Sequence, residues 1–185
     1  MKKTFVISLF AILFCSCSMN NNIITSNLAS LDTLVKKESF QKEINGKKVD
    51  LFTLRNDSGM IVKITNYGGR IVSVLIPTKK NNYVDVTLGY SNLETYFKDP
   101  TYSGALIGRY ANRIRNGKFQ LDKQAFTLAT NNKPNSLHGG NIGFDKVVWD
   151  ANQSNDSLVL NYVAKDMEEG YPGELKVEAR YILTN

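Results

Sequence analysis

Short runs in which apolar and polar residues alternate constrain the fold of this chain more than any other feature. The clearest run covers residues 175–183, where every second position is apolar: Leu175, Val177, Ala179, Tyr181 and Leu183. Successive side chains of a β-strand point to opposite faces, so this run predicts one buried and one exposed face. Strand patterns also occupy residues 39–45, 48–55, 60–66, 71–76, 118–121, 125–128, 147–151 and 158–164.

Turn-forming clusters separate these runs. Asn45-Gly46-Lys47, Asp57-Ser58-Gly59 and Asp122-Lys123-Gln124 combine the residues that favour tight turns. Helical character is confined to residues 92–97, which are long enough for a turn or two. Many short strands joined by such turns predict an all-β fold, an antiparallel β-sandwich or barrel.

The first residues have the pattern of an export signal. Two lysines precede an apolar run from Phe5 to Phe14, which is too short to span a bilayer. Phe14-Cys15-Ser16-Cys17 resembles a bacterial lipobox, so we expect residues 1–16 to be removed and Cys17 to carry lipid; ordinary secretory cleavage nearby is the alternative. This predicts an exported bacterial lipoprotein of the periplasm or outer membrane, with a polar linker over 17–37 and a domain over 38–185.

Composition and motifs argue against several classes of function. The formal net charge is +6, but the basic residues are scattered rather than gathered in the stripe that nucleic acids require. The sequence has one histidine, His138, and its two cysteines lie in the lipobox region, so a zinc site is not expected. No dinucleotide-binding, Walker or serine-hydrolase motif occurs either.

Two segments, 104–117 and 135–149, gather glycines with amide, guanidinium and imidazole groups. Sugar hydroxyls both donate and accept hydrogen bonds, so a sugar site needs rigidly held planar groups, which Asn112, Arg113 and His138 would supply. The apolar wall of such a site has three candidates: Tyr110, Phe144 and Trp149. Gly139 and Gly140 would let backbone and ligand come close.

Each of these residues also has an ordinary structural interpretation. For Arg109, Arg113 and Arg115, each taken singly, a solvated or ion-paired surface position is the favoured interpretation. A histidine in a glycine turn is as often a hydrogen-bonded structural residue as a functional one, and the aromatic residues fit a core. From residue chemistry alone, the chain is an all-β domain with a candidate site for a polar ligand.

Six blocks of sequence, in order, resemble the aldose 1-epimerase (galactose mutarotase) family. They are Asn66-Tyr67-Gly68-Gly69-Arg70-Ile71, Asp85-Val86-Thr87-Leu88-Gly89-Tyr90, Gly108-Arg109-Tyr110-Ala111-Asn112-Arg113-Ile114, Asn135-Ser136-Leu137-His138-Gly139-Gly140, Gly143-Phe144-Asp145-Lys146 with Trp149, and Glu169-Gly170-Tyr171-Pro172-Gly173. The resemblance implies a large antiparallel β-sandwich that interconverts the α and β anomers of free aldohexoses such as galactose and glucose. It implies no metal or cofactor, and it makes Asn112, Arg113 and His138 contacts to the sugar.

The same resemblance implies a histidine acid in a motif like Asn-His-Ser-Tyr-Phe-Asn-Leu and a glutamate base near the C-terminus of the family's domain. Neither motif occurs in this sequence. We therefore expect an N-terminal portion of the β-sandwich, inactive alone, with no catalytic residue of its own. The alternative is a non-catalytic carbohydrate-binding surface lipoprotein. A relative acting on hexose 6-phosphates would need further basic residues clustered at the site.

Overall fold

The computed structural model describes residues 34–80, 82–98 and 100–185, and in these ranges the protein is built from antiparallel strands. The strands are β1 (Lys42–Ile44), β2 (Lys47–Val49), β3 (Leu51–Arg55), β4 (Ile61–Thr65), β5 (Arg70–Pro77), β6 (Tyr83–Asp85), β7 (Arg113–Ile114), β8 (Lys118–Leu121), β9 (Gln124–Thr127), β10 (Ser136–Leu137), β11 (Asp150–Gln153), β12 (Ser157–Ala164) and β13 (Leu175–Ile182). A single short α-helix, α2 (Leu93–Lys98), lies in the described ranges, together with the 3₁₀ turns η1 (Lys37–Phe40), η2 (Arg115–Gly117), η3 (Phe144–Lys146) and η4 (Glu168–Gly170). The all-β prediction is confirmed.

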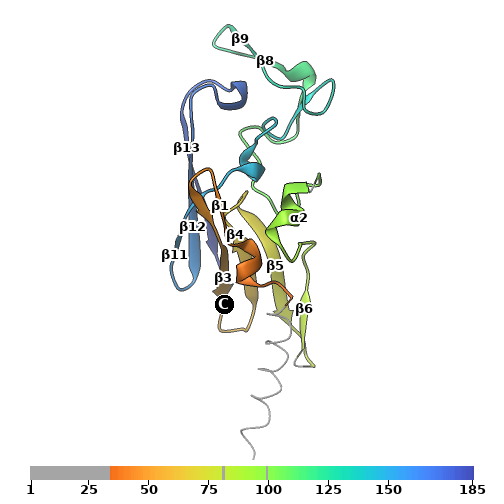
Figure 1. Ribbon diagram of the computed structural model, residues 1–185, viewed down its shortest axis with the longest axis vertical. Coiled ribbons are helices and arrows are strands. Elements are labelled where there is room, and N and C mark those ends of the chain that lie inside the picture. The colour runs from red at the N-terminus through yellow and green to blue at the C-terminus, as the bar shows by residue number, and fades with distance from the viewer. Residues whose placement is uncertain (1–33, 81, 99) are drawn as a thin grey trace, which may run out of the picture.

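Two sheets face each other across the main core. One has the order β3-β4-β5-β6 and the other β11-β12-β13. Leu54 and Ile64 from the first sheet pack with Leu158 and Leu160 from the second, and Trp149 completes the cluster with an exposed fraction of 1%. This is the predicted sandwich, and the strands of both sheets run along the long axis of the molecule (Figure 1).

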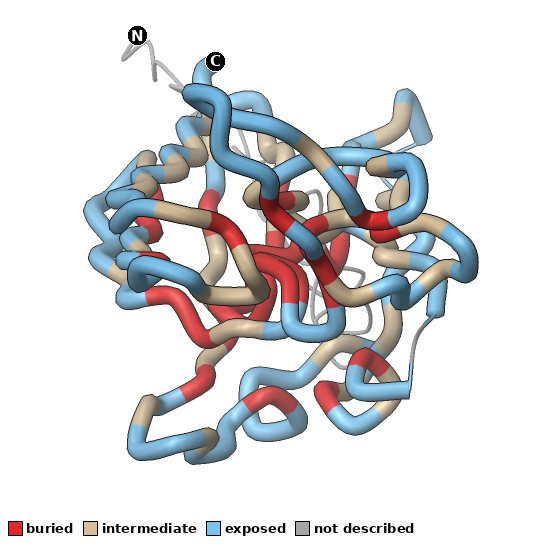
Figure 2. Tube along the Cα trace, turned by 90° about the horizontal axis from the view of Figure 1, so that it is seen from above, coloured by how far each residue is buried: buried red, intermediate tan, exposed pale blue. Residues whose placement is uncertain are grey.

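The other face of the four-stranded sheet is covered as well. η1 and α2 lie against it (Figure 1), and Phe40, Leu93 and Tyr96 from these two elements pack on Val72 of β5. The sheet is therefore buried on both faces, and Figure 2 shows the buried stretches gathered at the centre of the molecule. Burial on both faces explains why residues 71–76 are almost continuously apolar rather than alternating.

Three predicted strands differ clearly from the structure. The strand predicted over 39–45 begins only at Lys42, because Ser39 and Phe40 belong to η1. Two further strands differ because of their pairing. Residues 48–55 form two strands rather than one, because the chain changes partner at Asp50: β2 pairs with β1, whereas β3 pairs with β4. The strand predicted over 147–151 begins only at Asp150, and Val148 makes an isolated bridge to Tyr67 instead. Long-range partners decide both boundaries, and alternation within a segment does not reveal them.

The segment 66–70 connects these parts of the fold. The buried Asn66 side chain donates to the carbonyls of Lys48 (3.0 Å) and Trp149 (2.9 Å) and accepts from the N–H of Asp50 (2.8 Å). Its backbone carbonyl accepts from the N–H of Trp149 (2.9 Å). One amide thus ties the β2–β3 corner to the segment that leads into β11.

Gly68 extends this connection to a third segment. Its N–H donates to the carbonyl of Val147 (2.8 Å), and its carbonyl accepts from the N–H of Leu106 (2.9 Å). Both segments that carry the candidate site residues are therefore hydrogen-bonded to the same short stretch of the chain.

The predicted signal peptide and the lipidated Cys17 lie outside the described residues. Within the described ranges, no helix has the length and apolar character needed to cross a membrane.

We predict that Asn66→Asp lowers the free energy of unfolding by about 3 kcal/mol, because an aspartate keeps the acceptor for Asp50 but loses both donors to buried carbonyls. The only tryptophan, Trp149, is buried, so its fluorescence during urea unfolding provides the measurement. The exposed Asn152 on β11 is the matched control, where the same substitution should cost less than about 0.5 kcal/mol. Equal losses at the two positions would contradict this role for Asn66.

Candidate functional site

The pairing of β7 with β10 brings the two glycine-rich segments together. Its register places Leu137 opposite Arg113. One step further, the N–H of His138 donates to the carbonyl of Asn112 (3.0 Å), and the N–H of Asn112 donates to Nδ1 of the His138 ring (3.0 Å). The three predicted sugar-binding residues therefore lie together in the structure.

The hydrogen bond from Asn112 also fixes the state of the His138 ring. A backbone N–H can only donate, so Nδ1 must be the unprotonated acceptor. In the neutral imidazole the proton then resides on Nε2, which becomes a hydrogen-bond donor. Asn112 and His138 both adopt positive φ angles, 66° and 53°, which turn the two residues toward one another.

Residues that the sequence analysis did not single out support this pair. The ring of Tyr102 meets the His138 ring edge-on, with 4.7 Å between centroids. Asn131 holds the loop around it, donating to the carbonyls of Leu137 (2.9 Å) and Gly140 (2.7 Å) and accepting from the N–H of Leu137 (2.7 Å). Asparagine is common in turns for many reasons, so the sequence alone carries no signal for this role.

Arg113 lies at the rim of a hollow of about 400 Å³. Its Nε donates to Oδ1 of Asn132 (2.9 Å), and its guanidinium also reaches Oδ1 of Asn112 (3.4 Å). The hollow is lined by Arg109, Tyr110, Arg113, Ile114, Arg115, Phe119 and Tyr171. Arg113 thus both contacts Asn112, the partner of His138, and lines a hollow large enough for a monosaccharide.

The aromatic candidates separate into two groups. Tyr110 is 53% exposed and lines the hollow. Phe144 and Trp149 are core residues, packed edge to face with 5.5 Å between centroids. Phe119 and Tyr171, which the sequence analysis did not propose, take the place of those two in the wall and stack on each other at 5.9 Å.

Arg109 has a structural role. Its guanidinium donates to the carbonyls of Lys165 (2.6 Å), Gly173 (2.6 Å) and Pro172 (3.2 Å) in the connection between β12 and β13. Of the three arginines in the segment, Arg109 therefore matches the structural interpretation, because it fastens the site to the second sheet.

The two glycines after His138 allow other segments of the chain to pack closely against them. A Cβ on Gly139 would overlap the carbonyl oxygen of Gly108, and one on Gly140 would overlap the carboxylate of Glu169. That carboxylate accepts from the N–H of Asn141 (2.7 Å). The expectation that these glycines admit a ligand is replaced by a close approach between segments of the chain.

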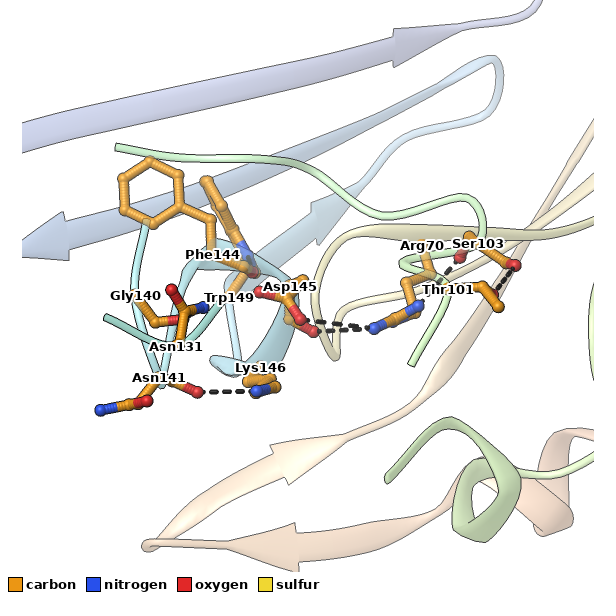
Figure 3. Close-up of polar contacts among 10 residues, drawn as sticks. All are labelled: Arg70, Thr101, Ser103, Asn131, Gly140, Asn141, Phe144, Asp145, Lys146 and Trp149. Carbon is orange, nitrogen blue, oxygen red and sulfur yellow. Dashed lines mark hydrogen bonds and ion pairs between the residues drawn. The ribbon is translucent and has the colours of Figure 1, made fainter. Parts of the chain in front are cut away.

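A buried ion pair connects β5 to η3. Arg70 and Asp145 face each other with 3.7 Å between Nη2 and Oδ2 (Figure 3), and Arg70 also donates to the carbonyl of Ser103 (2.9 Å). Burial raises the pKa of the Asp145 carboxyl, and the positive charges of Lys146 and Arg70 offset part of that effect. Removing one partner of such a pair leaves the other buried and uncompensated, so this contact holds η3 in place.

In the part of the chain that the structure describes, no group of three or more histidine, cysteine, aspartate or glutamate side chains is arranged to hold a metal ion.

Residues 50–185 match the family model described as aldose 1-epimerase. The chain belongs to the aldose 1-epimerase family. It is 44% identical to bovine galactose mutarotase over 135 residues, which cover 73% of this chain and 39% of that protein. It is 37% identical to the aldose 1-epimerase of Escherichia coli over 142 residues, covering 76% of this chain and 41% of the relative.

Solved structures of the family give the same assignment. The aldose epimerase homologue from C. elegans superposes with a TM-score of 0.71 at 26% identity, covering 74% of this chain and 42% of that one. Galactose 1-epimerase from Lactobacillus acidophilus gives a TM-score of 0.66 at 33% identity, covering 76% and 42%. The chain thus has the family's fold over about two fifths of the relatives' length.

We predict that Gly139→Ala destabilises the protein by at least about twice as much as Gly46→Ala. Both glycines have positive φ, 95° and 76°, so both substitutions incur the left-handed strain of about 1–2 kcal/mol. A Cβ at Gly46 meets nothing within 4 Å, whereas one at Gly139 would overlap the Gly108 carbonyl. Urea unfolding followed by Trp149 fluorescence gives both values, and equal costs would show that Gly139 is required only for its φ.

We also predict that the neutral His138 ring in the folded protein carries its proton on Nε2. Because the chain has one histidine, ¹⁵N NMR of the imidazole reports on this residue without assignment. The same measurement on the chain unfolded in urea should show a mixture of the two neutral tautomers. A folded ring protonated at Nδ1 would rule out the hydrogen bond from Asn112.

Proposed function

We propose that this chain forms the sugar-holding part of an aldose 1-epimerase that acts on free aldohexoses such as galactose and glucose. The observation that carries the proposal is the reciprocal pairing of Asn112 with His138 next to Arg113, whose side chain contacts Asn112 and which itself lines the aromatic-walled hollow. Family membership supports the same reading, since the relatives are named as galactose mutarotases and aldose 1-epimerases.

The chemistry of these groups suits a sugar. His138 offers a directed Nε2–H donor, Arg113 offers further N–H donors, and the Asn112 side chain both donates and accepts. Tyr110 and Phe119 offer apolar surface to the C–H faces of a pyranose ring. Because β7, β10 and Asn132 hold the polar groups in place, little side-chain entropy is lost when a hydroxyl binds.

The role that we propose for these residues is binding rather than turnover. Anomer interconversion needs a base at the anomeric hydroxyl and an acid at the ring oxygen. The histidine and glutamate motifs that the family resemblance implies for these steps do not occur in the 185 residues. Nδ1 of His138 accepts the N–H of Asn112, so we assign its Nε2–H to hydrogen bonding with the sugar rather than to proton transfer. Lipid attachment at Cys17, and with it a membrane location, remains a proposal that rests on residues 14–17.

We predict that the 185-residue chain binds galactose and leaves its mutarotation at the spontaneous rate. Titration calorimetry measures the binding, and polarimetry on freshly dissolved α-D-galactose measures the turnover. Arg113→Gln should weaken binding about tenfold, as expected for losing a hydrogen bond from a charged group, whereas Arg180→Gln on exposed β13 should change it less than about twofold.

Two results would contradict this function. Absence of sugar binding would exclude the binding role. A mutarotation rate well above the spontaneous one that disappears in His138→Ala would instead make His138 the acid or base.

A further inference from the structure

The hollow beside the candidate site has an unusual charge. Its lining contains three arginines, Arg109, Arg113 and Arg115, and no acidic residue. The side chain of Arg115 makes no hydrogen bond or ion pair with any described residue, and Arg115 is among the residues that line the hollow. The Nε of Arg109 is buried there without a hydrogen-bond partner among the described residues. Positive charge is therefore concentrated in a space that the surrounding protein does not neutralise.

The backbone that carries Arg115 is held in place. Arg115 begins η2, and its carbonyl accepts the N–H of Lys118. The next N–H, that of Asn116, donates to Oδ1 of Asn135 (3.2 Å). Gly117, at a φ of 60°, lies against the carbonyl of Leu128 and closes the turn. The backbone at Arg115 is thus held next to the paired strands β7 and β10, which also carry Arg113 and lead into His138.

The lining of the hollow also includes packed aromatic side chains. Phe119 stacks on Phe126 at 5.2 Å and on Tyr171 at 5.9 Å, and Tyr171 is buried. A ligand in the hollow would therefore meet both apolar ring surface and planar cationic donors. Guanidinium groups match carboxylate and phosphate oxygens in geometry as well as in charge.

We propose that the hollow selects aldoses that carry an anionic group, a carboxylate or a phosphate, and that Arg115 is the residue that recognises that group. This inference rests on the proposed function, because it assumes that the neutral part of the sugar is held by Asn112, Arg113 and His138. Arg113 lies between the two parts of the site and contacts the ring hydroxyls, whereas Arg115 faces the charged substituent.

The test compares four probes on the full 185-residue chain by titration calorimetry: D-galactose, D-galacturonate, D-galactose 6-phosphate and inorganic phosphate alone. We expect at least one of the two anionic sugars to bind about tenfold more tightly than galactose. Which of them gains affinity distinguishes a carboxylate from a phosphate. Raising the ionic strength from about 0.05 M to about 0.5 M should reduce this preference, because the charges lie at an open surface.

The decisive variant is Arg115→Gln, which should lower the ratio of anionic to neutral sugar affinity about tenfold. Arg180→Gln is the matched control: it makes the same change in charge on β13, away from the hollow, and should leave the ratio within about twofold. An equal effect of the two variants would show that the preference for anionic sugars depends only on the net charge of the protein, and it would overturn the proposal.

The remaining outcomes separate this inference from the proposed function. Galactose binding without any gain for the anionic sugars would overturn the inference and leave the sugar site standing. Failure of every sugar to bind would overturn both. Inorganic phosphate binding as tightly as galactose 6-phosphate would show an anion site unrelated to the sugar, which also overturns the inference.

Discussion

The hydrogen bonds of Asn66 and Gly68 are the contacts on which the rest of the architecture depends. Through them, one short turn after β4 reaches the β2–β3 corner, the segment before β11 and the segment at Leu106. Buried backbone groups must be satisfied somewhere, and here a single turn satisfies those of three separate segments. The same segments contribute Trp149 and Leu106 to the sandwich core, so the polar turn and the apolar core join the same parts of the chain.

This arrangement explains how loops can present a precise site. Loops that carry function are normally positioned by a rigid scaffold. Here, the 104–117 segment is fastened to the second sheet by Arg109, and η3 is fastened to the first by the Arg70–Asp145 pair. Asn131 then holds the turn around His138. The side chains that the sequence analysis proposed as ligand contacts therefore fall into two groups. Some hold the loop segments together, and the others remain free to contact a ligand.

The sequence predicted the fold class and the strand content, because alternation and turn residues are local signals. It also predicted that Asn112, Arg113 and His138 belong together, and the β7–β10 register shows them in contact. The split at Asp50 and the late start of β11 escaped prediction because distant partners set them. For the same reason, Phe144 and Trp149 could not be separated in sequence from residues that line the hollow, such as Phe119. Nor could the sequence show that Gly139 lies against Gly108 and Gly140 against Glu169.

The close contact between Gly139 and Gly108 has a consequence for how such a site can diverge. The loop segments are joined mostly by backbone atoms and by side chains that bond to backbone, so few substitutions there leave the fold intact. The hollow is different, because Tyr110 and Arg115 project from these segments into open space. Substitutions that change the shape or charge of the hollow should therefore be tolerated best at such exposed positions, whereas the Asn112–His138 pair is built into the contact between the two segments.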